Sequence, residues 1–163
     1  MLAALQGTTI EPAYLTGAAF LRTMGIMNQA EIARILDVAM NPNSLFVSFS
    51  DGKRARNASA RLLDVEADMR PVVDYLTDMT SVSDVIKIVS RHPPVLSYSV
   101  PDRLQPFFEY MKSIGVTDVG AVIVARPSLL GLDVNNNLKK IVEYLQYVDT
   151  PTETIIKYLE TSI

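Results

Sequence analysis

The chain has 163 residues, of which 48% are hydrophobic and 20% are charged, and its formal net charge is −3 with a pI of about 5.1. This length and apolar content predict a folded domain or short solenoid and argue against intrinsic disorder. The absence of cysteine excludes disulfides, thiolate nucleophiles and thiolate metal sites, and the acidic balance argues against a surface that coats duplex nucleic acid, because such surfaces are normally basic.

The N-terminal segment has no basic residue before Arg22, so it lacks the charged start of a secretory signal and the arginines of a transit peptide. If the protein is imported into an organelle, we therefore expect this sequence to be its mature form. The longest apolar run, 119–125, spans 7 residues. Roughly 20 apolar residues are needed to cross a bilayer, so no transmembrane segment is predicted.

A first, weak helical unit is predicted over residues 14–46, where Ile32, Ile35 and Leu36 follow helical spacing. Residues 47–68 form a polar insert between this unit and the next. The insert places basic residues before acidic ones. We expect it to be a loop near Gly52 followed by a polar helix.

Three later segments copy one another: 69–76, 104–111 and 138–145 each close on an acidic residue, a tyrosine and an apolar residue. Equivalent positions are 35 and then 34 residues apart. A constant spacing of this size indicates stacked units within one domain, 1–163. We expect about three and a half units of 34–35 residues, with later boundaries at 69–103 (second unit), 104–137 (third unit) and 138–163 (terminal partial unit).

Each unit contains signals for two helices and a turn. In one copy of the repeat they predict a helix over 101–113, a second helix from 117 or 118 to 125, and a proline-led turn over 126–131. Ser99 and its equivalent Asp133 suit the N-terminal cap of the first helix, whereas Gly115 suits a left-handed C-terminal cap. In the terminal unit we expect the second helix over 152–158.

The phrases RHPPVLSYSVPDRLQPFFEYMKSIGV and ARPSLLGLDVNNNLKKIVEYL resemble the repeat of the mitochondrial transcription termination factor (mTERF) family. The resemblance rests on the proline turns, the Ser or Asp helix starts and the Ile-Gly-Val helix end, and it covers 69–150 well and 18–46 loosely. It implies an all-α, curved solenoid with two longer helices and one short turn helix per unit. It also implies a mitochondrial or plastid location and binding of DNA or RNA along a basic concave face.

The candidate contacts to a nucleic acid or another partner are six cations. Four lie in the insert, where they form a basic cluster, and two lie at the ends of second helices: Lys53, Arg54, Arg56, Arg61, Arg91 and Arg126. The insert cations could instead form a solvated face paired with Asp64 and Glu66. A cation at a helix C-terminus also stabilises the negative end of the helix dipole, so the two remaining arginines have a structural alternative.

The repeated tyrosines Tyr75, Tyr110 and Tyr144 could stack on bases, one per unit. They adjoin the apolar stripe, however, and an acidic residue that would repel phosphate precedes each of them. We therefore interpret them as packing residues. Since His92 is the single histidine and no glycine-rich phosphate loop is present, the sequence indicates no catalytic, cofactor-binding or metal site, no small-molecule substrate and no enzyme.

The end of the terminal unit offers a further candidate. A stripe left uncovered there would expose apolar residues to a partner, and its members are Ile155, Ile156, Leu159 and Ile163.

From these observations we expect a non-catalytic binding or scaffold subunit that contacts the protein subunits of a large organellar complex. The alternative is an organellar nucleic-acid-binding factor, in transcription termination, RNA maturation or ribosome assembly, whose cations contact the DNA or RNA backbone. Overall charge favours the first expectation, because a negatively charged solenoid suits a protein surface better than a duplex.

Overall fold

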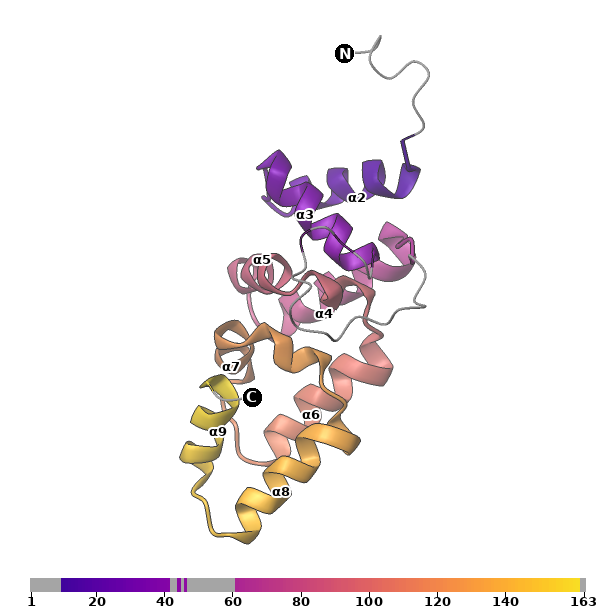
Figure 1. The fold of residues 1–163 in the computed structure, drawn as a ribbon. Coiled ribbons are helices and arrows are strands. Elements are labelled where there is room, and N and C mark those ends of the chain that lie inside the picture. The colour runs from indigo at the N-terminus through magenta and orange to yellow at the C-terminus, as the bar shows by residue number, and fades with distance from the viewer. Residues whose placement is uncertain (1–9, 42–43, 45, 47–60, 162–163) are drawn as a thin grey trace.

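The computed structural model describes residues 10–41, 44, 46 and 61–161. Every regular element in these ranges is helical, which confirms the all-α prediction. Helices pair in chain order, and the pairs follow one another from one end of the molecule to the other (Figure 1). The predicted cations 53, 54 and 56 lie outside the described residues.

Within the described residues the longer helices form four pairs: α2 (Pro12–Thr23) with α3 (Gln29–Met40), α4 (Arg70–Met79) with α5 (Val82–Arg91), α6 (Gln105–Ser113) with α7 (Val119–Ala125), and α8 (Lys139–Tyr147) with α9 (Thr152–Thr161). Short turns precede or follow them. Three are wide π-helical turns that lead into a first helix: η2 (Val65–Met69), η4 (Val100–Leu104) and η6 (Val134–Leu138). Two are 3₁₀-helices that follow a second helix: η3 (Pro93–Ser97) and η5 (Pro127–Gly131).

The wide turns begin at the capping residues. Ser99 Oγ accepts a hydrogen bond from the Asp102 amide at 3.2 Å, and Asp133 Oδ1 accepts one from the Asn136 amide at 3.0 Å. Asp64 caps η2 in the same way. These caps satisfy amides that the first turn of a helix leaves free. Both caps predicted from the sequence, Ser99 and Asp133, are confirmed.

The position of η2 corrects one expectation about the insert. Residues 65–68 do not belong to a separate polar helix, because η2 runs directly into α4. Leu63, just before this turn, and Met69, its last residue, are both buried, and their burial joins the turn to the core. The acidic residues Glu66 and Asp68 therefore lie in the turn that leads into α4.

Three first helices, α2, α6 and α8, are followed by a left-handed residue, whereas α4 is followed by Thr80 with a negative φ. Gly25 and Gly115 have φ angles of 107° and 98°, which glycine adopts without the steric cost of a side chain. Asp149 occupies the equivalent position after α8 with a φ of 62°. The predicted cap at Gly115 is confirmed, and the terminal unit makes the same turn with an aspartate.

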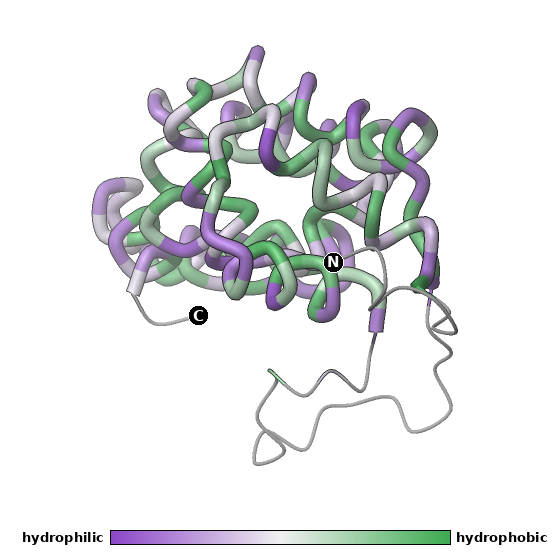
Figure 2. Tube along the Cα trace, turned by 90° about the horizontal axis from the view of Figure 1, so that it is seen from above, coloured by the Kyte–Doolittle hydropathy of each residue, from purple (hydrophilic) through white to green (hydrophobic). Residues whose placement is uncertain are grey.

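The core runs through all four pairs as one continuous apolar cluster. Side chains such as Leu76, Phe107 and Met111 are fully buried in it. The second helices contact one another in sequence, α3 with α5, α5 with α7 and α7 with α9. Figure 2, a view from above, shows hydrophobic and hydrophilic residues alternating along the chain, as expected when each helix buries one face.

Candidate partner-binding surface

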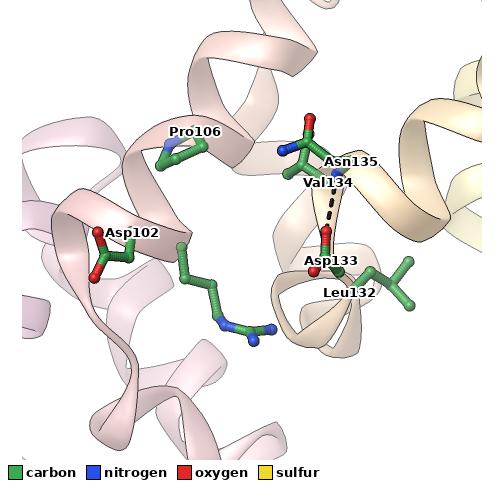
Figure 3. A pocket seen from close by; sticks show the side chains of 7 residues that line it. Asp102, Pro106, Leu132, Asp133, Val134 and Asn135 are labelled. Atoms are coloured by element: carbon green, nitrogen blue, oxygen red, sulfur yellow. Dashed lines mark hydrogen bonds between the residues drawn. The ribbon is translucent and has the colours of Figure 1, made fainter.

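Two equivalent grooves lie between the wide turns that start successive units. The first lies between η2 and η4 and is lined by Arg61, Asp68 and residues 97–101. The second lies between η4 and η6 and is lined by Asp102, Arg103, Pro106 and residues 132–135 (Figure 3). Its volume is about 170 Å³, below the roughly 300 Å³ at which small-molecule pockets begin. We call this pair the start grooves.

An arginine spans each start groove and binds a backbone carbonyl of a 3₁₀-helix. Arg61 Nη1 donates to the Ser97 carbonyl at 2.9 Å, and Arg103 Nη1 donates to the Gly131 carbonyl at 2.8 Å. Arg61 also forms an ion pair with Asp68 at 3.0 Å. Each arginine thus satisfies a carbonyl at a 3₁₀-helix end.

A second row of arginines joins the second helices. Arg91 Nη1 on α5 donates to the Val124 carbonyl near the end of α7 at 2.8 Å, and Arg34 on α3 donates to the Ser90 carbonyl near the end of α5. The last carbonyls of a helix have no partner within it, and a cation also stabilises the negative end of its dipole. Both arginines therefore hold one unit against the next.

These contacts show which of the candidate cations have partners within the molecule. Arg61 and Arg91 are exposed, but each has a guanidinium engaged with a neighbouring unit. Arg126 is half-buried, and its side chain makes no hydrogen bond or ion pair within the described part of the chain. The expected pairing of Arg61 with Asp64 or Glu66 is wrong: Asp64 caps η2 and Glu66 binds Arg70, so Asp68 is the partner.

His92 is part of a packed contact between units. Its Nε2 lies 2.7 Å from the Tyr98 hydroxyl, at hydrogen-bonding distance. A Cβ built on Gly131 would lie 2.9 Å from the same hydroxyl, so glycine allows this close approach. Burial lowers the pKa of His92 to about 4. The imidazole is therefore neutral near pH 7 and does not offer a cation to phosphate.

The repeated tyrosines follow a regular pattern of contacts. The Tyr75 and Phe108 rings, from successive units, form a T-shaped pair with centroids 5.5 Å apart. Burial, and then the charge of Glu109, raise the pKa of the Tyr75 hydroxyl. Burial and the charge of Glu143 raise the pKa of Tyr110 in the same way. Tyr75 and Tyr110 thus lie near an acidic side chain of the following first helix, whereas Tyr144 is exposed.

The apolar end expected on α9 needs correction. Ile155 and Leu159 are buried, and Ile156 is half-buried against the core, because α9 turns its apolar face toward α7 and α8. Ile163 lies outside the described residues. The large apolar side chains exposed at this end are instead Tyr144, Tyr147, Val148 and Tyr158.

The charge of the described residues is more negative than that of the whole chain. Three cations of the insert and Asp51 lie outside them, so 12 basic and 17 acidic side chains remain, a formal net charge of −5. Within the described ranges, no group of His, Asp or Glu side chains is arranged to hold a metal ion. In the same ranges no helix is long and apolar enough to span a membrane.

Sequence reasoning missed the two inter-unit arginines Arg34 and Arg103. The repeat held a usable signal, because the two carbonyls bound in the start grooves, those of Ser97 and Gly131, are 34 residues apart. The donors are not at equivalent positions, so an offset comparison of arginines alone could not find them. The roles of Arg34 and Arg103 follow only from the distances between neighbouring units in the structure.

The model of the mTERF family matches residues 60–163, which is more than half of the chain. The matched region covers the pairs α4/α5, α6/α7 and α8/α9 with their short turns. No curated protein and no solved structure matched the chain.

Proposed function

The chain belongs to the mTERF family, and from that premise we propose that it is a non-catalytic subunit that binds protein within an organellar assembly of the gene-expression machinery. The resemblance in the repeat implies mitochondria or plastids as the location. The contacts and charge of the described surface help to distinguish a protein partner from a nucleic acid.

One observation carries the preference for a protein partner. Four arginines, Arg34, Arg61, Arg91 and Arg103, use their guanidinium groups to hold carbonyls of neighbouring units. A phosphate would have to compete with those carbonyls for the donors. Nucleic-acid affinity depends largely on cations that neutralise phosphates, and a described surface with a net charge of −5 supplies few of them.

Nucleic-acid binding is the second candidate, and two observations favour it. Membership of the mTERF family is one. The other is the supply of cations: the Arg126 side chain has no partner among the described residues, and Lys53, Arg54 and Arg56, which lie outside those residues, stand close together in the sequence. Contacts of these four to the backbone would give modest affinity that falls with salt and carries little sequence preference.

Affinity purification of the tagged full chain from organelle lysate, with and without nuclease, separates the two candidates. The proposal predicts a defined set of protein partners that remains bound after nuclease treatment. Loss of every partner after nuclease would instead support nucleic-acid binding. A variant with Lys53, Arg54 and Arg56 changed to Glu should keep its protein partners, and a variant with Lys87, Lys112 and Lys140 changed to Glu serves as the charge-matched control.

A further inference from the structure

The end of α8 exposes three large apolar side chains, and two of them, Tyr144 and Val148, stand at positions that are packed one unit earlier. Tyr144, Tyr147 and Val148 lie at i, i+3 and i+4, so they share one face of the helix. Their exposed fractions are 64%, 84% and 47%. We call them the terminal tyrosine face.

Backbone hydrogen bonds show which residues of α6 and α8 occupy equivalent positions. The amide of Val148 donates to the Tyr144 carbonyl, as the amide of Ile114 donates to the Tyr110 carbonyl, with 3.1 and 3.2 Å between donor and acceptor. Tyr144 therefore corresponds to Tyr110 and Val148 to Ile114. Tyr110 and Ile114 are both half-buried and packed against the core. The terminal positions repeat these residue types without a cover in the described structure.

The contacts that Tyr75 and Tyr110 make with the following first helix indicate which side chains pack against a tyrosine at this position. Tyr75 meets Phe108 edge to face, and the acidic residue that raises its pKa is the next one along the chain, Glu109. For Tyr110 the nearby acid is Glu143, which follows the buried Val142. Each covering helix thus presents an apolar residue followed by a glutamate. The apolar side chain can pack on the ring while the carboxylate lies near the hydroxyl.

We propose that the terminal tyrosine face docks an α-helix of a partner protein that carries an apolar residue followed by an acidic one, placed as the next unit of the stack would be. This continues an interface that the molecule already makes within itself. It rests on the proposed function in requiring a protein partner, and it adds where that partner binds and which residues it presents.

A fluorescent peptide with the sequence of 100–113, held helical by a hydrocarbon staple, supplies a probe of known structure, because this segment is the one that covers Tyr75. Its affinity for the full chain is measured by anisotropy. We expect saturable binding that weakens at least tenfold in the Tyr144→Ala chain and by less in Tyr144→Phe, which keeps the ring but removes the hydroxyl near the carboxylate. Met27→Ala, which removes an exposed apolar side chain far from α8, is the matched control and should bind normally.

Changes in the peptide test the proposed pair directly. Replacing its phenylalanine at position 108 by alanine, or its glutamate at 109 by lysine, should each weaken binding at least fivefold. Absence of binding, or binding indifferent to Tyr144 and to both peptide changes, would overturn the proposal. Sedimentation of the chain alone is run in parallel, and self-association that disappears in Tyr144→Ala would overturn it by making a second copy the occupant.

The outcome can be separated from that of the proposed function. A chain that retains its protein partners after nuclease but ignores the peptide would leave protein binding intact and refute this docking site. Because Tyr144 is mostly exposed, the alanine variant should fold normally, which circular dichroism checks.

Discussion

Acidification to about pH 5 should destabilise the fold through His92, because burial lowers the pKa of this side chain from 6.5 to about 4. The imidazole is neutral in the folded state, where it lies 2.7 Å from the Tyr98 hydroxyl. The unfolded chain takes up a proton near pH 6.5, whereas the folded chain does not until about pH 4. Stability is thus complete above the unfolded pKa and falls as the pH drops through this window, by about 2 kcal/mol between pH 7.5 and pH 5.

Urea unfolding followed by circular dichroism at several pH values measures this loss. Since His92 is the single histidine, a His92→Gln variant removes the titration while keeping a polar side chain that can reach Tyr98. Ordinary carboxylates titrate near pH 4, mostly below the window, so the variant should show a much flatter profile. Equal pH dependence in the two proteins would refute the reasoning that His92 is buried and neutral.

Three further substitutions test the contacts between and within units. Arg91→Ala removes the hydrogen bond to the α7 carbonyl and should lower the free energy of unfolding by about 1 kcal/mol, whereas Lys87→Ala on the same helix should leave it unchanged. Asp149→Gly relieves the left-handed backbone and should raise the free energy of unfolding by up to about 1 kcal/mol, after the greater entropy of the unfolded glycine chain is subtracted. Leu159→Ala leaves a cavity and should cost about 3 kcal/mol, but Tyr147→Ala should change stability by less than about 0.5 kcal/mol. All are read by urea unfolding at pH 7.5; similar losses for Leu159→Ala and Tyr147→Ala would contradict the corrected assignment of the terminal surface.

Local signals made much of the fold predictable from the sequence. Ser99, Asp133 and Gly115 are short-range devices, since each acts on backbone groups within a few residues of itself. The repeat then carried these assignments from one unit to the next. The polar helix expected in the insert was wrong for residues 65–68 because the acidic residues after Asp64 also suit a solvated helix, and the sequence alone did not show that they lead into α4.

The surface was harder to predict, because it depends on distances between units. Arg91 carries the same charge whether it faces a phosphate or a carbonyl, and only its 2.8 Å contact with Val124 distinguishes the two. The apolar stripe of α9 could have faced outward along the stack or inward. The contact of α9 with α7 and α8 turns Ile155 and Leu159 inward.

Binding of a labelled, generic 20-base-pair duplex to the full chain at two salt concentrations tests most directly whether the surface serves protein rather than nucleic acid. Because its arginines hold neighbouring units together and its described residues are net negative, the account predicts at most weak binding to DNA or RNA. Tight binding that falls steeply between about 50 and 200 mM salt, and that is lost when Arg91 and Arg126 become Glu, would contradict it.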